Sequence, residues 1–141
     1  MTKAVEVKSY LETVAAGMPV VPTDQVQVTY GFPMRAPEKK WIAVGEIRWE
    51  SSEWATNRSR NEAFSVQVIF DVQMSGATAK EVEAYAVLMS RDFLAALMAD
   101  PSLGGLAITS GFQPRSMRAF PSDRDTYECQ FETEVSVTCR V

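Results

Sequence analysis

Two long stretches of this chain alternate between apolar and polar side chains, and this alternation constrains the fold more than any other feature. In residues 64–74 every second side chain is apolar, and Ile69 is the apolar residue that breaks the polar series. In residues 126–141 the apolar series consists of Tyr127, Cys129, Phe131, Val135, Val137, Cys139 and Val141, with Thr133 among them. A period of two is typical of a strand with one buried face. We therefore expect a sheet that is covered on one face and polar on the other.

Two helices are predicted to cover that sheet. In residues 3–16 the apolar side chains recur at helical spacing. A second helix begins at Thr78, which forms a capping box with Glu81 in which each side chain can satisfy a free backbone amide. It runs to about Ala99, and Asp100 can then cap the short turn that follows. Its core-facing stripe is expected to be Val82, Tyr85, Ala86, Met89, Phe93, Ala96 and Leu97.

The remaining segments complete the predicted architecture. Residues 26–30, 41–49 and 106–120 are expected to be strands, and residues 19–24, 31–40, 50–61 and 121–125 to be loops. In the strand expected at 41–49, one face should carry Trp41, Ala43, Gly45, Ile47 and Trp49. The element order predicts an α+β fold in one domain, residues 1–141, with two helices on one face of a mostly antiparallel sheet of about five strands. Long hairpin loops should protrude from it.

The overall charge argues against several classes of partner. The 141 residues contain 18 acids and 14 bases, which gives a formal net charge of −4. Dedicated nucleic-acid binders are usually basic, and anionic membrane surfaces attract basic proteins. No apolar run approaches the roughly 20 residues of a membrane span, and the N-terminal residues contain no apolar signal core. We expect a protein that binds no membrane and is made, and stays, in a cytoplasm.

The sequence contains no recognisable catalytic constellation. It has no histidine, which removes the commonest general base and the usual metal ligand. Cys129 and Cys139 lie on one predicted strand, about 33 Å apart at roughly 3.3 Å per residue. They can neither form a disulfide nor share a zinc ion, so they should be free, buried thiols. No phosphate-binding glycine loop is present. We predict no catalytic residue, no metal site and no cofactor.

Carboxylates are the remaining candidates for acid–base chemistry. One group along the sequence is Glu50, Glu53 and Glu62, and another, on one face of the last strand, is Glu128, Glu132 and Glu134. Such groups are usually solvated surface, and nothing in the sequence indicates a pocket around them. We therefore expect a protein that is not an enzyme, and a small carboxylate-based enzyme remains an alternative.

Arginines gather in the predicted long loop and around the last predicted hairpin turn. The long loop contains Trp54, Asn57, Arg58 and Arg60, and the last hairpin turn is flanked by Arg115, Arg118 and Arg124. Three interpretations of the arginines stay open. They serve solubility, they bind a partner's carboxylates through the guanidinium fork, or they contact a nucleic-acid backbone.

The second helix carries more apolar surface than one sheet can cover. Val87, Leu94 and Met98 form a second apolar line away from the core stripe, with Lys80 and Arg91 beside it. A helix that packs only on its own sheet should be polar there. Either the N-terminal helix covers this line, or the line is a subunit interface of apolar residues surrounded by charge.

The order of elements resembles a known family. The strand at 64–74, the helix at 78–99, the Asp-Pro-Ser-Leu-Gly-Gly link at 100–105 and the closing hairpin together resemble the tail terminator proteins of long-tailed, siphovirus-type bacteriophages. The resemblance implies a hexameric ring of α+β subunits that caps the tail tube, ends its polymerisation and docks on the head connector. It further implies a virion protein, assembled in the host cytoplasm, whose partners are its own copies, the tail tube protein and the head connector or adaptor, with DNA only as passing cargo.

Several residues can be placed in such a ring. The predicted subunit interface is Val87, Arg91, Leu94 and Met98, because a closed ring needs two different patches that meet. The predicted contacts to the tail or neck are Trp54, Asn57, Arg58, Arg60, Arg115, Arg118 and Arg124. A wall of the DNA channel could be formed by Glu128, Glu132 and Glu134 on the uncovered sheet face, where their charge would repel DNA. The alternatives are a related head–tail joining or tail completion protein and an adaptor of another phage-derived apparatus.

Overall fold

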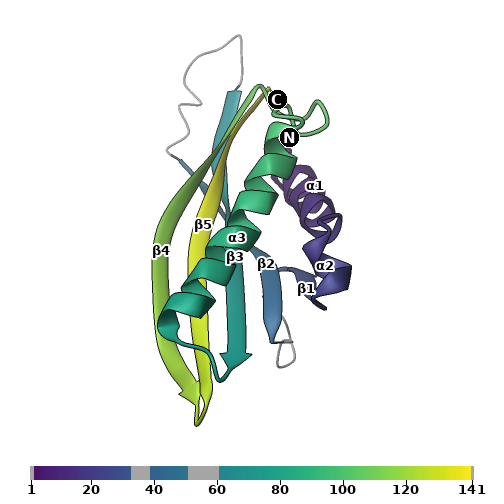
Figure 1. Cartoon of the computed structure of the whole chain (residues 1–141). Helices are drawn as coiled ribbons and strands as arrows, with labels where there is room; N and C mark the ends of the chain where they lie inside the picture. The colour runs from purple at the N-terminus through teal and green to yellow at the C-terminus, as the bar shows by residue number, and fades with distance from the viewer. Residues whose placement is uncertain (1, 33–38, 51–60, 141) are drawn as a thin grey trace.

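A single five-stranded sheet organises the part of the chain that the computed structural model describes, residues 2–32, 39–50 and 61–140. The strands are β1 (Gln27–Tyr30), β2 (Lys40–Trp49), β3 (Asn61–Ser75), β4 (Thr109–Asp123) and β5 (Thr126–Arg140), in the spatial order β1-β2-β3-β5-β4 (Figure 1). β1 runs parallel to β2, and the other neighbours are antiparallel. The predicted α+β class is therefore confirmed, and the parallel pair makes the sheet mixed.

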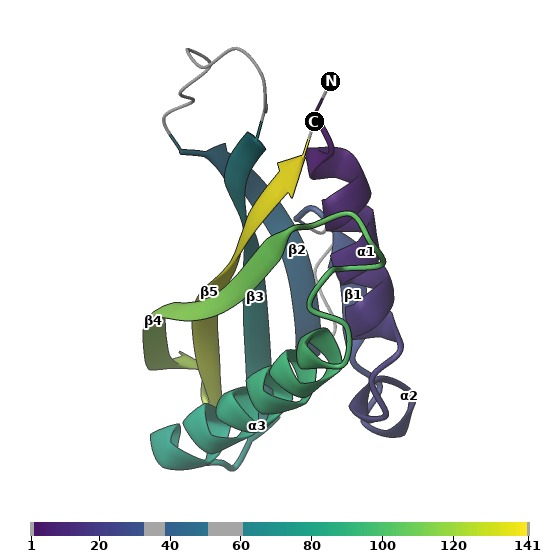
Figure 2. The same cartoon turned by 90° about the horizontal axis from the view of Figure 1, so that it is seen from above.

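The helices cover one face of this sheet, as the sequence predicts. α1 (Ala4–Ala16) packs on β1 and β2, and α3 (Ala79–Met98) packs on β3, β5 and β4 (Figure 2). The core between the layers contains the fully buried side chains of Leu11, Ile42, Phe64, Phe70 and Phe93. No helix among the described residues is long and apolar enough to cross a membrane.

A short third helix, α2 (Val20–Thr23), replaces part of the loop predicted at 19–24. Pro19 precedes it with a φ of −58°, which is already the helical value. The Asp24 amide donates to the Val20 carbonyl over 2.9 Å and closes the turn. A single turn of four residues leaves no apolar stripe in the sequence, which is why the spacing of side chains does not predict it.

The apolar series of β5 is the face that packs on the core. Cys129 and Cys139 are both buried on it, and both thiols are free. Thr133 is also fully buried, and its hydroxyl donates to the Val68 carbonyl over 2.7 Å. That bond satisfies the one polar group in the series, so the strand keeps a continuous buried face.

β2 does not keep one face along its length, which corrects the predicted set Trp41, Ala43, Gly45, Ile47 and Trp49. Its register with β3 shifts between Val44 and Ile47, so the strand contains a bulge. Before the bulge, Trp41 and Ala43 form a small buried cluster with Ile69 on the face that no helix covers. After it, Ile47 packs against the main core, and the Trp49 ring lies 6.4 Å from the Phe64 ring. The cluster also explains why Ile69 breaks the polar series of β3.

The last hairpin is tighter than predicted. Residues 121–123 belong to β4, Asp123 pairs with Thr126, and the turn consists of Arg124 and Asp125. The loop predicted at 121–125 is therefore reduced to a two-residue turn at the end of the hairpin. Of the long loop predicted at 50–61, residues 51–60 lie outside the described residues, and Asn61 already belongs to β3.

β4 forms one outer edge of the sheet, and its pairing with β5 is interrupted twice. The register shifts between Pro114 and Ser116 and again between Pro121 and Asp123. Proline lacks the N–H that a strand ladder needs, and bulges and prolines are therefore typical of edge strands.

The link between α3 and β4 is held by Asp100, which confirms its predicted role as a cap. Its carboxylate accepts from the Gly104 amide over 3.0 Å and from the Ser102 amide over 3.2 Å. Hydrogen bonds from Ser102 and Gly104 lower the pKa of the Asp100 carboxyl group. Leu103 takes up a left-handed φ of +52° and is fully buried. A Cβ on Gly104 would lie 3.2 Å from the Tyr10 ring, so the link also fits closely against α1.

The capping box at the start of α3 is present in part. The Glu81 amide donates to the Thr78 hydroxyl oxygen over 3.3 Å, as predicted. The Glu81 carboxylate accepts from the Thr78 hydroxyl over 3.4 Å, whereas the capping box would have it accept from the Thr78 amide.

Replacing Thr78 with alanine should lower the free energy of unfolding by about 1 kcal/mol, because the Glu81 amide loses its acceptor. Urea unfolding followed by circular dichroism measures this loss. Thr78→Ser keeps the hydroxyl and is the matched control, which should stay close to the parent protein. An alanine variant as stable as the serine variant would contradict a capping role.

Candidate assembly surfaces

A shallow apolar hollow of about 500 Å³ lies between α3 and the edge strand β4. Ala84, Val87 and Leu88 of α3 and Met117 of β4 supply its apolar lining, and Lys80, Glu83 and Arg91 of α3 supply the charges. Helical spacing places the α3 residues on one flank of the helix. The Leu88 side chain is 52% exposed. Apolar lining bordered by both signs of charge is the arrangement expected of a protein-binding surface.

The predicted interface residues lie along this flank of α3. Val87 is half-buried against the core, Leu94 is half-buried, Arg91 is exposed, and Met98 is 62% exposed. The alternative that α1 covers this flank does not hold for the hollow, because no residue of α1 lines it. The opposite flank of α3 faces the N-terminal elements: the Tyr85 hydroxyl donates to Asp24, and the Lys40 ammonium lies 4.8 Å from the Tyr85 ring.

Five residues that line the hollow were not among the predicted interface residues: Lys80, Glu83, Ala84, Leu88 and Met117. Leu88 follows Val87 directly, so its position beside the predicted apolar line could have been predicted from the helical spacing. Met117 could not be predicted, because only the pairing of β4 with β5 brings that strand beside α3.

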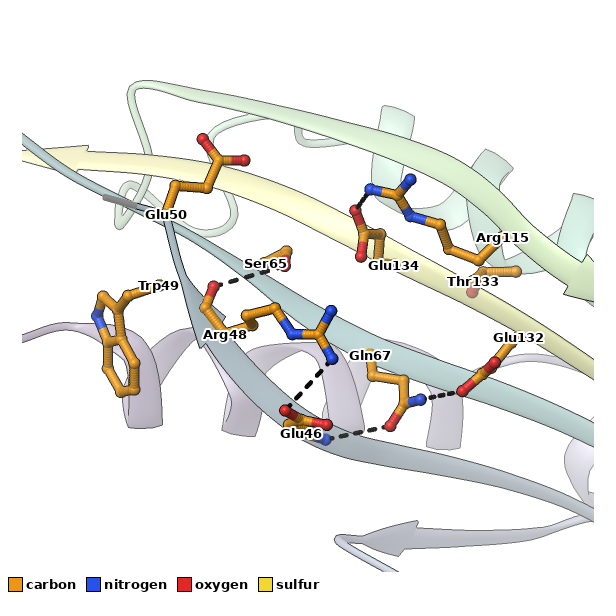
Figure 3. Close-up of a pocket in the computed structure, with 10 residues that line it drawn as sticks. All are labelled: Glu46, Arg48, Trp49, Glu50, Ser65, Gln67, Arg115, Glu132, Thr133 and Glu134. Carbon is orange, nitrogen blue, oxygen red and sulfur yellow. Dashed lines mark hydrogen bonds and ion pairs between the residues drawn. The ribbon is translucent and has the colours of Figure 1, made fainter. Parts of the chain in front are cut away.

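The uncovered face of the sheet carries a second hollow, of about 530 Å³, which is lined by polar side chains from four strands (Figure 3). Gln67 donates to Glu132, Ser116 donates to the other oxygen of Glu132 over 3.1 Å, and Arg115 forms an ion pair with Glu134. Glu132 and Glu134 therefore lie on the uncovered face, as predicted, and both are already engaged by partners of the same chain.

Arg115 and Arg118 belong to this face, which corrects their assignment to a contact loop. Both are residues of β4, and the Arg118 guanidinium donates to Gln130 over 2.9 Å. Arg124 alone of the three lies in the turn. Because Arg115 compensates Glu134, the face is not uniformly negative. The other predicted contact residues, Trp54, Asn57, Arg58 and Arg60, lie outside the described residues.

A third hollow, of about 610 Å³, adjoins the polar one on the same face. Its apolar side consists of Phe32, Trp41 and Ile69, and Phe32 is 60% exposed. Its polar side consists of Ser116, Arg118, Gln130 and Glu132. The uncovered face thus offers aromatic and polar contacts side by side.

Glu128 lies on the predicted face, but it is not the solvent-facing residue that a channel wall requires. It is only 8% exposed, and the amides of Gln73 and Gln130 donate to its carboxylate over 3.0 and 3.5 Å. Beside it lies Asp71, whose side chain is fully buried. Asp71 was not predicted as a special residue, because its position in the polar series indicates exposure. Its burial depends on the neighbouring strands.

The carboxylates considered for an enzymatic alternative divide between the two faces of the sheet, and Glu132 and Glu134 line the polar hollow. Glu50 borders the polar hollow on the uncovered face. Glu62 is buried on the covered side of the sheet, opposite Cys139 in the β3–β5 register. Its carboxylate accepts a hydrogen bond from the Thr2 hydroxyl. Glu53 lies outside the described residues. Within residues 2–32, 39–50 and 61–140, no three His, Cys, Asp or Glu side chains are grouped as metal ligands would be.

Comparison with known proteins finds similarity among solved structures. No protein-family model matches the sequence, and no curated protein matches it. A chain of the structure described as "Virion of native gene transfer agent (GTA) particle" is similar to this chain, with 13% sequence identity and a TM-score of 0.45. The similarity covers 93% of each of the two chains.

Proposed function

We propose that this protein is a structural subunit of a phage-type tail, a tail terminator that assembles into a ring on the end of the tail tube. The observation that carries the proposal is the apolar hollow between α3 and β4. It leaves Leu88 52% exposed on a helix whose core side is formed by Val82, Ala86, Met89, Phe93 and Leu97. The order and length of the elements, which resemble those of tail terminators, support the same role.

The hollow suits the contact that a ring requires. Copies in a closed ring meet through two different patches, so one patch can be a hollow and the other a projection. The apolar lining would exclude water from the centre, and Lys80, Glu83 and Arg91 would form the polar rim. Val87, Leu94 and Met98 extend this surface along α3. Six such contacts would close the hexamer that the resemblance implies.

The uncovered sheet face is proposed to contact the DNA that passes through the ring or the proteins that lie against the ring. Glu132 and Glu134 would line a channel for DNA, with Arg115 reducing their repulsion. The other proposed partners are the tail tube protein and the head connector. A head–tail joining protein, a tail completion protein or an adaptor of another phage-derived apparatus could use the same surfaces.

Electron microscopy of tails assembled without this protein tests the proposal directly. We expect overlong tails of variable length, and we expect added protein to restore one fixed length. Tails of normal, fixed length that fail to join heads would indicate a joining or completion protein instead. Normal particles in its absence would contradict a structural role in the tail.

A further inference from the structure

Two carboxyl groups lie next to each other inside the uncovered face of the sheet. Asp71 of β3 pairs with Gln130 of β5, and Glu128 of β5 pairs with Gln73 of β3. Asp71 and Glu128 are therefore diagonal neighbours across the β3–β5 ladder, within reach of each other's side chains. Asp71 is 0% exposed and Glu128 is 8% exposed. Water therefore cannot solvate a charge on Asp71.

The hydrogen bonds around the pair go mainly to Glu128. The amides of Gln73 and Gln130 both donate to Glu128. Neither carboxylate oxygen of Asp71 makes a hydrogen bond to a described residue. Gln130 also lowers the pKa of Asp71, but burial and Glu128 have larger effects in the opposite direction. The indole N–H of Trp41, which pairs with Asp71 across β2 and β3, is buried without a hydrogen-bond partner among the described residues. A buried carboxylate with no donor is among the most costly arrangements in a protein interior, and such a group usually becomes neutral instead.

The other elements around Asp71 supply no direct counter-charge. On β2 the residue paired with Asp71 is the uncharged Trp41, and the neighbouring Lys40 directs its ammonium to the Tyr85 ring. On β4 Arg118 is bound to Gln130. On the covered face, burial raises the pKa of the Cys129 thiol, and the charges of Glu83, Asp71 and Glu128 raise it further. The acidic group that raises the pKa of Asp71 itself is Glu128.

We propose that Asp71 and Glu128 share one proton in the folded protein at neutral pH, with the neutral Asp71 donating to the Glu128 carboxylate, and that loss of this proton weakens the β3–β5 pairing. The shared proton removes the charge of Asp71 and gives its carboxyl group a hydrogen bond to Glu128. The pKa of Asp71 is raised to about 8, because burial penalises its charged form and because Glu128 both favours the shared proton and repels a second charge.

This pair makes the stability of the fold fall as the pH rises from about 4 to about 8. The pKa of Asp71 is near its ordinary value of 3.8 when the chain is unfolded and about 8 when it is folded. Between these values the folded protein binds more protons than the unfolded chain, so its stability falls as the pH rises. The unfolding equilibrium constant should increase by up to about tenfold per pH unit in this window and level off above it.

Asp71→Asn tests the proposal, because asparagine keeps the donor to Glu128 and cannot ionise. Urea unfolding at a series of pH values between 5 and 9 should show the parent protein losing stability. The variant should lose much less and should be the more stable protein at pH 8. Glu46→Gln is the matched control on the same face, since Glu46 is exposed, and it should keep the pH dependence of the parent. Parallel curves for the parent and Asp71→Asn would overturn the proposal.

Two further measurements keep the proposal testable if Asp71→Asn does not fold. The Asp71 carboxyl carbon, followed by NMR in labelled protein, should titrate near pH 8. Titration near pH 4 would overturn the proposal. Glu128→Gln places an amide donor beside Asp71 and should move that titration to lower pH. A bound cation is the competing explanation. If calcium chloride stabilised the parent protein at pH 8 but not Asp71→Asn, a cation and not a proton would neutralise the pair.

Discussion

Replacing Phe93 with alanine should lower the free energy of unfolding by about 3–5 kcal/mol, as for other fully buried aromatic residues. The Phe93 side chain is 0% exposed and lies at the centre of the contact between α3 and the sheet. Its ring centroid is 5.8 Å from that of Phe70 on β3 and 6.1 Å from that of Phe112 on β4. Truncation would leave a cavity bordered by both rings and would weaken the packing of α3 on β3 and β4.

Chemical unfolding of the variant and the parent at equal pH measures this loss. Leu88→Ala is the matched control on the same helix, because Leu88 is 52% exposed and its truncation removes little core packing. It should cost much less than Phe93→Ala. Equal losses for the two variants would mean that α3 does not pack through the Phe93 side.

In the proposed ring, Leu88→Asp should abolish the contact between subunits while leaving each subunit folded. The substitution places a carboxylate in the apolar lining of the α3–β4 hollow, between Val87 and Met117. Burying that charge against a neighbouring copy would cost about 2 kcal/mol or more at each contact. Because a closed ring repeats the contact at every subunit, the effect on assembly multiplies.

Sedimentation velocity over a range of concentrations, with electron microscopy of the rings, measures the loss of assembly, and circular dichroism checks the fold. Ile108→Asp introduces the same charge at a position that is 50% exposed and outside the hollow, and it should assemble normally. Leu94→Asp extends the test along α3. Rings formed by Leu88→Asp as readily as by the parent would exclude the hollow as the contact surface.

The layers of this fold could be predicted because their signals are local. The alternation in β3 and β5 and the capping box of α3 are fixed by neighbours two to four positions away in the sequence. The bulge in β2 and the parallel pairing of β1 were not predicted, because they depend on which strands become neighbours. The prediction that Trp41 and Trp49 share one face of the sheet was wrong for that reason. The register shift after Val44 moves the later side chains of β2 to the opposite face.

The surfaces could be predicted only in part. Val87 and Arg91 follow from the spacing along α3, and Glu132 and Glu134 follow from the alternation of β5. Asp71 could not be found in this way. The same alternation that correctly assigns it to the uncovered face also predicts that it is solvated, and only Trp41, Gln130 and the rest of the sheet bury it. Burial of a polar residue is a property of the assembled sheet.

The interruptions along β4 have a consequence for how copies of this protein behave when they are crowded. A long, regular outer strand can template the addition of further strands and lead to open-ended fibres. Here the missing amides of Pro114 and Pro121 and the two register shifts divide the free edge into short runs. Strand-by-strand growth along β4 is therefore hindered, and crowded copies are less prone to form fibres through this edge.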